Sequence, residues 1–176
     1  FFEEGGGFAS LRGCYLGGVY EAAPHKPESN YRGFVRRTHF MVTAADMLHT
    51  SLRVAGETLD LSACAFHAFR RTLDMQSGLL TRSFVWETKA AGRVEVCFER
   101  LVSMTRPELA AQRITLCALD GDAAAELCMG VNGNVIHQAT GQCQWKDLGG
   151  DELLLQTETT GISVRYALDT DCPGTE

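Results

Sequence analysis

Acidic side chains are the most abundant reactive groups in this chain of 176 residues, which has 22 Asp and Glu residues and 16 Lys and Arg residues. Two carboxylates held on either side of a bond can serve as acid and base, or as acid and nucleophile, in hydrolysis. Seven carboxylates are candidates for such a pair: Glu3, Glu4, Glu21, Asp74, Glu87, Asp120 and Asp122. Any chain of this composition offers such a set, and turn, cap and surface roles are commoner for these residue types. We therefore assign no catalytic residue.

Histidine and cysteine show no functional spacing. The five histidines are His25, His39, His49, His67 and His137. The seven cysteines are Cys14, Cys64, Cys97, Cys117, Cys128, Cys143 and Cys172. Because neither set contains an H-E-x-x-H motif or a C-x-x-C pair, we predict no metal site and no cofactor. An odd number of cysteines leaves one thiol unpaired in any disulfide scheme, so we predict reduced, buried cysteines.

The charge balance excludes a nucleic-acid partner held by a basic surface, because the formal net charge is −6 and the pI is about 5.4. A hydrophobic content of 45% is ordinary for a globular domain. No apolar run approaches the roughly 18 residues of a membrane span, and no signal peptide is recognisable. We therefore predict no membrane partner and a cytoplasmic location. The chain begins with Phe1 rather than Met, which suggests a fragment.

Alternation of apolar and polar residues is the main structural pattern. Val94, Val96 and Phe98 alternate with polar residues, as in a half-buried strand. A strand over residues 83–86 precedes it, and residues 87–92 form the expected hairpin loop. Residues 52–54 and 59–61 form a second expected pair of strands around a turn at 55–56. Short strands between turn residues predict an all-β sandwich or barrel.

Later segments continue this pattern. The alternating run at residues 125–131 meets Asn132-Gly133, a pair that favours a two-residue type I′ hairpin turn. Runs at 153–155 and 162–166 are expected strands separated by turn residues. Residues 107–112 predict one helical turn that begins with Pro107. Residues 22–29 are expected to form an exposed loop.

Five motifs occur in order along the first two thirds of the chain. They are G-G-G-F-A-S-L-R-G at residues 5–13, G-V-Y-E at 18–21, V-A-G-E at 54–57, L-D-M-Q-S-G-L-L-T-R at 73–82 and R-L-V-S-M at 100–104. From Gly5 to about Leu119, this series resembles the N-terminal domain of glycoside hydrolase family 65. That family contains maltose, trehalose and kojibiose phosphorylases and related hydrolases. The sequence departs from the family pattern at Gly6, where the family has Asn, and at Leu101, where it has Phe.

The resemblance implies a super-β-sandwich like that of galactose mutarotase, with antiparallel strands and little helix. We expect it over residues 1–168, with a tail at 169–176. In the family, the catalytic acid and the phosphate-binding residues lie on an (α/α)-barrel domain that follows this one. The implied function is therefore that of a non-catalytic domain, which supports the barrel and a homodimer of an enzyme acting on α-linked glucose disaccharides. The chain alone is expected to be inactive.

The motif residues are assigned structural roles, and they are Gly7, Arg12, Gly13, Asp74, Gly78, Arg82, Arg100 and Ser103. Arg12 and Arg82 each lie near turn residues, where a guanidinium can bind carbonyls or an acid such as Asp74.

Aromatic side chains offer a route to carbohydrate binding, because a pyranose ring has an apolar face that they can cover. Tyr15, Tyr20 and Tyr31 are the candidates, since they lie near the glycine-rich segment and the proline-containing loop. Trp86 is expected in the core. An alternative function is a free-standing, mutarotase-like module that binds or modifies sugars.

Overall fold

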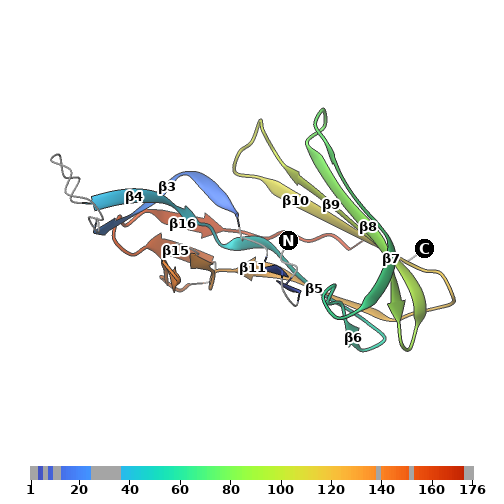
Figure 1. Cartoon of the computed structure of the whole chain (residues 1–176). Helices are drawn as coiled ribbons and strands as arrows, with labels where there is room; N and C mark the ends of the chain where they lie inside the picture. The colour runs from blue at the N-terminus through green and yellow to red at the C-terminus, as the bar shows by residue number, and fades with distance from the viewer. Residues whose placement is uncertain are drawn as a thin grey trace. The chain divides into compact units, whose positions relative to one another are not determined.

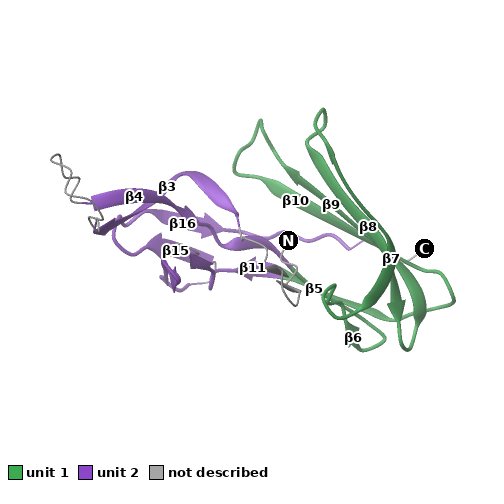
Figure 2. Cartoon of the chain, viewed as in Figure 1, with its two compact units in different colours: residues 1–10, 50–129 green, residues 11–49, 130–176 purple. Residues whose placement is uncertain are grey.

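The computed structural model describes residues 4–5, 8–9, 13–24, 37–137, 140–150 and 153–172. These residues contain no helix, and each strand pair whose register is defined is antiparallel. The predicted all-β, antiparallel fold is therefore confirmed. The chain divides into two compact units, formed by residues 1–10 with 50–129 and by residues 11–49 with 130–176 (Figure 2).

The first unit contains the longest hairpins (Figure 1). Its strands are β1 (Glu4–Gly5), β2 (Phe8–Ala9), β6 (Glu57–Thr58), β7 (Ala65–Asp74), β8 (Leu79–Thr88), β9 (Gly92–Val102) and β10 (Ala110–Ala118). Two further strands, β5 (Asp46–Val54) and β11 (Ala125–Asn132), have residues in both units. The sheets have the orders β10-β9-β8-β7 and β11-β5-β6.

The core of the first unit lies between these two sheets. Phe84 and Trp86 of β8 and Val96 of β9 are at most 1% exposed, because alternate side chains of a strand share one face. Leu52 and Val54 of β5 pack against them in the same hydrophobic cluster. Burying such side chains contributes roughly 1.5–3 kcal/mol each. The predicted alternation in β9 and the predicted core position of Trp86 are both confirmed.

The second unit has the strands β3 (Tyr15–Pro24), β4 (Arg37–Thr43), β12 (Ile136–His137), β13 (Gln142–Cys143), β14 (Trp145–Asp147), β15 (Leu153–Thr157) and β16 (Ser163–Tyr166). The pairs β3-β4 and β12-β13 and the sheet β14-β15-β16 surround a second hydrophobic cluster. Val42, Trp145 and Leu155 belong to it. The indole Nε1 of Trp145 donates a hydrogen bond to the Thr43 carbonyl at 2.7 Å, so its buried polar atom is satisfied.

Four local expectations need correction. The exposed loop expected at residues 22–29 does not begin at residue 22, because β3 continues to Pro24 and Ala22 is buried; residues 25–29 lie outside the described part of the chain. The hairpin loop is shorter than 87–92, because β8 continues to Thr88 and β9 begins at Gly92. Residues 107–112 form no helical turn; a hydrogen bond from Leu109 N to the Arg106 carbonyl closes a turn, and β10 then begins at Ala110. Asn132 does not start a type I′ hairpin, because β11 pairs with β5 rather than with the next strand.

The turn between β5 and β6 follows the expected pattern. Ala55 and Gly56 have φ angles of 47° and 81°, as a two-residue type I′ turn requires. β6 covers only Glu57–Thr58, while Leu59 and Leu61 pack against the first cluster beyond its end. The extent of the predicted domain, residues 1–168, and of the tail at 169–176 stays a prediction.

Candidate functional site

The motifs at residues 73–82 and 100–104 meet at one end of the β10-β9-β8-β7 sheet, which we call the motif end. Residues 75–78 connect β7 to β8 and residues 103–109 connect β9 to β10, and Figure 1 shows both connections side by side. A Cβ added to Gly78 would lie 3.7 Å from Leu101 Cδ1, so the motifs touch directly. Gly78 itself has φ 71°, a conformation that side-chain-bearing residues rarely adopt.

Asp74 holds the β7–β8 turn together. One carboxylate oxygen accepts a hydrogen bond from Gln76 N at 2.9 Å, and the other accepts one from Ser77 Oγ at 2.6 Å. Gly78 N donates to the Asp74 carbonyl at 2.8 Å. These hydrogen bonds, with that of Ser77 first, lower the pKa of Asp74, so the side chain is a carboxylate at neutral pH. The turn that Asp74 begins therefore binds its carboxylate.

Ser103 organises the β9–β10 loop in the same way. Its hydroxyl accepts a hydrogen bond from Arg106 N at 3.0 Å, and its backbone N–H donates to the Leu109 carbonyl at 3.0 Å. An ion pair of 3.2 Å between Arg106 and Glu108 lies across the loop. Ser103 is therefore the residue that fixes the loop's conformation.

Arg82 is buried at 7% exposure on the inner face of β8. Its guanidinium carbon lies 4.6 Å from the ring centroid of Phe98 and 5.9 Å from that of Phe84. Both distances fall within the range of a cation–π interaction, which contributes about 0.5–2 kcal/mol. Arg82 thus stacks on aromatic rings of the core.

Arg100 continues the same face on β9, two residues beyond Phe98. Its Nε donates to the side-chain oxygen of Gln112 on β10. The amide nitrogen of Gln112 donates in turn to Thr50 Oγ1 on β5 at 2.6 Å. The arginine therefore belongs to a polar chain that links three strands. Gln112 is a member that the motifs did not reveal.

The tyrosine candidates lie in the second unit. Tyr15 and Tyr20 are 47% and 42% exposed on β3, and a register shift separates them. The ring of Tyr15 lies against Gly13, where an added Cβ would be 3.5 Å from Cε2. The structure therefore places both rings at the surface of the second unit. Gly7, Arg12 and Tyr31 fall outside the described residues.

Glu21 has a role that sequence reasoning missed. It is 1% exposed, and its carboxylate accepts hydrogen bonds from the backbone N–H groups of Ala22, Thr159 and Thr160 at 2.8, 2.8 and 3.0 Å. The Thr160 hydroxyl adds a hydrogen bond of 2.6 Å to the Tyr20 carbonyl. The carboxylate therefore fastens the turn after β15 to β3. The available signal was the G-V-Y-E motif, which puts Glu21 on the same inward face of its strand as Val19.

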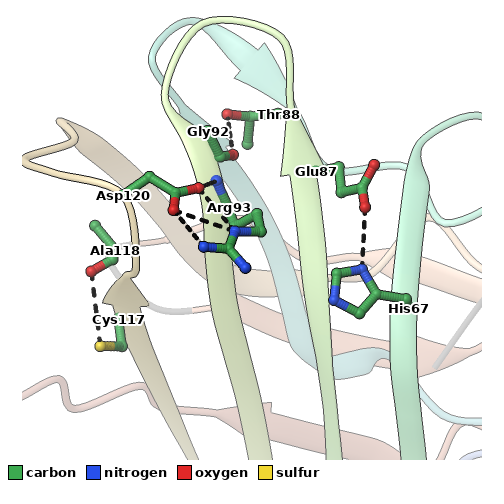
Figure 3. Close-up of polar contacts among 8 residues, drawn as sticks. All are labelled: His67, Glu87, Thr88, Gly92, Arg93, Cys117, Ala118 and Asp120. Atoms are coloured by element: carbon green, nitrogen blue, oxygen red, sulfur yellow. Dashed lines mark hydrogen bonds and ion pairs between the residues drawn. The ribbon is translucent and has the colours of Figure 1, made fainter.

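The opposite end of the four-stranded sheet carries an ion pair. Figure 3 shows Arg93 on β9 facing Asp120, with its Nη2 2.6 Å from one carboxylate oxygen and its backbone N 2.7 Å from the other. The hydrogen bonds from Arg93 lower the pKa of Asp120 to about 2. His67 and Glu87 form a separate contact of 3.1 Å on β7 and β8 (Figure 3).

The carboxylates of Asp74, Asp120 and Glu99 are unsuited to proton donation. A general acid in glycosidic-bond cleavage needs a pKa raised towards neutrality, whereas Asp74 and Asp120 have lowered values. The Arg113 side chain likewise lowers the pKa of Glu99 through a hydrogen bond of 2.6 Å. The surroundings of these three groups stabilise the anion, which fits bracing of the fold rather than acid catalysis.

The thiols and histidines show no reactive arrangement either. Burial raises the pKa of the Cys14, Cys64 and Cys97 thiols, which disfavours the nucleophilic thiolate. Within the described part of the chain, no three His, Cys, Asp or Glu side chains are grouped so that they could hold a metal ion. The described residues also include no helix that is long and apolar enough to cross a membrane.

Comparison with known families decides the assignment. The sequence profile of the "Glycosyl hydrolase family 65, N-terminal domain" matches residues 1–175. The chain belongs to glycosyl hydrolase family 65. The resemblance inferred from the five motifs is thereby confirmed.

Individual family 65 relatives agree. The chain is 33% identical over 127 residues to an alpha,alpha-trehalose phosphorylase of Thermoanaerobacter brockii, covering 72% of this chain and 16% of the relative. It is 32% identical over 121 residues to a kojibiose phosphorylase of Escherichia coli K12, covering 69% of this chain and 14% of the relative. A solved structure described as a kojibiose phosphorylase from the human microbiome superposes with a TM-score of 0.76 at 30% identity, covering 91% of this chain and 22% of that one. This likeness confirms the sandwich fold. The chain spans about a sixth of the curated relatives.

Proposed function

We propose that this chain is a non-catalytic N-terminal β-sandwich domain of a larger family 65 enzyme, a glycoside hydrolase or a disaccharide phosphorylase acting on α-linked glucose disaccharides. One observation carries the proposal. The family's N-terminal profile matches residues 1–175, yet the chain spans only 16% of the trehalose phosphorylase and 14% of the kojibiose phosphorylase. The larger share of such a protein, which includes the (α/α)-barrel implied by the resemblance, is the proposed partner.

The chemistry of the described side chains supports a structural role. Asp74, Ser103 and Glu21 each bind backbone N–H groups of a turn, and Arg82 stacks inside the core. Motif residues with such contacts set the shape of the sheet end and of the β3 surface. We infer that this shape, rather than a reactive group, is what the domain supplies to the barrel and to a homodimer.

A second candidate function is carbohydrate binding, either within the parent enzyme or by a free-standing module. The observation that favours it is the exposure of Tyr15 and Tyr20 on one strand, where a ring can stack on a pyranose. Titration of the chain with glucose, maltose or trehalose, followed by tyrosine fluorescence or NMR shifts, tests it. Saturable shifts that Tyr20→Ala abolishes would support this second function.

A cytoplasmic location is also a proposal. All seven cysteines are free thiols, and a reducing compartment keeps thiols in that state. Fractionation of the source cells with an antibody against this domain is the appropriate measurement.

The native length tests the main proposal. The intact mass of the natural gene product, measured by mass spectrometry, should exceed the 19.2 kDa of this chain several-fold, since the relatives do. A native protein that ends near Glu176 would contradict the proposal and favour the free-standing module.

A further inference from the structure

Two methionines at the motif end are exposed to an unusual degree. Met104 is 92% exposed and Met75 is 83% exposed. These are the two highest values among the large apolar side chains of the described residues. Leu73, Leu101 and Val102 beside them are 54%, 37% and 61% exposed. These five side chains come from the two adjoining connections and the strand ends next to them. We call them the apolar tip.

Hydrogen bonds fix the backbone under the apolar tip. Asp74 binds Gln76 N and Ser77 Oγ directly beneath Met75. Ser103, the residue before Met104, accepts a hydrogen bond from Arg106 N and donates one to the Leu109 carbonyl, which closes the loop that carries Met104. Both methionines are therefore presented by ordered turns, so their exposure does not result from fraying.

Exposure of the apolar tip to water is energetically unfavourable in the 176-residue chain by itself. Each fully buried methionine or leucine side chain contributes roughly 1.5–3 kcal/mol, which an exposed one forgoes. Several exposed apolar side chains at one end of a sheet are suited to a contact site, and methionine adapts its flexible thioether to irregular surfaces. Ordered turns that hold such side chains outward are preorganised for binding.

We propose that the apolar tip packs against an apolar protein surface in the part of the parent enzyme that lies outside this chain. The inference rests on the proposed function. The occupant follows from length, because the family 65 relatives contain several times more chain than this domain. A second copy of this chain and a carbohydrate are the competing occupants, and the experiment separates them.

Methionine oxidation offers a direct test, because the chain has five methionines and only two lie on the apolar tip. The natural full-length protein and the 176-residue chain are treated with dilute hydrogen peroxide, and peptide mass spectrometry gives the sulfoxide fraction at each methionine. Met75 and Met104 should oxidise on the order of tenfold more slowly in the full-length protein. Met41, which is 41% exposed on β4 of the other unit, is the internal control and should oxidise at the same rate in both.

Several outcomes would overturn the inference. Equal rates at Met75 and Met104 in a full-length protein of family length would remove the apolar tip as a contact while leaving the proposed function intact. Protection in the 176-residue chain that grows with its concentration would identify a second copy as the occupant, and protection caused by added maltose would identify a sugar. A natural protein no longer than this chain would end the proposed function and this inference together.

Substitution gives an independent readout. Met75→Gln combined with Met104→Gln should leave the melting temperature of the 176-residue chain unchanged, since both side chains are exposed there. In the full-length protein, the same pair should lower the melting temperature and speed proteolytic release of this domain. Met41→Gln is the matched control. An unchanged full-length protein would contradict the proposal.

Discussion

At the scale of the residue, polar side chains of this domain act mainly by satisfying backbone groups. Glu21 is the strongest case, because one buried carboxylate accepts three N–H donors from two segments far apart in sequence. A donor that loses its buried acceptor costs about 1–3 kcal/mol. The Glu21 side chain, which connects β3 to the turn after β15, is therefore expected to matter for stability.

Glu21→Ala should lower the free energy of unfolding by on the order of 3 kcal/mol, because the substitution leaves buried N–H groups without their acceptor. Glu21→Gln should cost less, since the amide keeps one oxygen acceptor. Urea denaturation of the isolated chain measures both. Glu158→Ala, at an exposed position beside the same turn, is the control and should change stability by less than about 0.5 kcal/mol. Equal effects at the two positions would contradict the assigned role.

Arg82 supplies the second test at this scale. Its guanidinium lies 4.6 Å from the Phe98 ring in a buried position, so Arg82→Ala should cost about 2–4 kcal/mol through lost packing and lost cation–π attraction. Arg82→Met should cost less, because an apolar side chain of similar length fills the same space. Arg113→Ala is the matched control on the outer face of the same sheet, where an exposed ion pair contributes at most about 1 kcal/mol. A loss below about 0.5 kcal/mol for Arg82→Ala would show that the stacking is not stabilising.

At the scale of the element, the β8–β9 hairpin is pinned at its turn end by Arg93 and Asp120. The folded pKa of Asp120 is about 2, below the roughly 3.9 of an unfolded chain. The ion pair therefore stabilises the fold above about pH 5, and this contribution is lost as the pH falls through about 2. Gly92 fits the same arrangement, because an added Cβ would lie 2.9 Å from Asp120.

Asp120→Asn should accordingly have a lower melting temperature than the unmodified chain at pH 7. The difference should shrink as the pH falls from about 5 to about 2 and vanish only below about pH 2, where Asp120 is protonated in both the folded and the unfolded chain. Calorimetry across this pH range measures it, with Asp122→Asn, an exposed carboxylate on the same connection, as the control. A difference that stays constant with pH would exclude the ion pair as its cause.

An element could be predicted from the sequence where neighbouring residues determine it, and not where residues far along the chain do. The period-two pattern of Val94, Val96 and Phe98 is sufficient to define a strand and its buried face. The type I′ hairpin predicted at Asn132 was wrong because β11 pairs with β5, about eighty residues earlier in the chain, rather than with the strand that follows it. Glu21 gave no sign of its partners, since Thr159 and Thr160 follow more than a hundred residues later. Only the folded chain brings such pairs together.

At the scale of the whole molecule, we propose that this chain is a domain without its own catalytic machinery. Its motif residues hold turns and core contacts, and its lowered carboxylate pKa values oppose acid catalysis. The family match over residues 1–175 explains the motifs without requiring an active site among them.

The most direct measurement is a phosphorolysis and hydrolysis assay of the purified 176-residue chain beside the full-length natural protein. Each is incubated with maltose, trehalose or kojibiose, with and without inorganic phosphate, and released glucose and glucose 1-phosphate are quantified. We predict turnover of at least one disaccharide by the full-length protein and none by the 176-residue chain alone. Turnover by the purified chain that persists after contaminating enzymes are removed would show that this domain has catalytic machinery of its own.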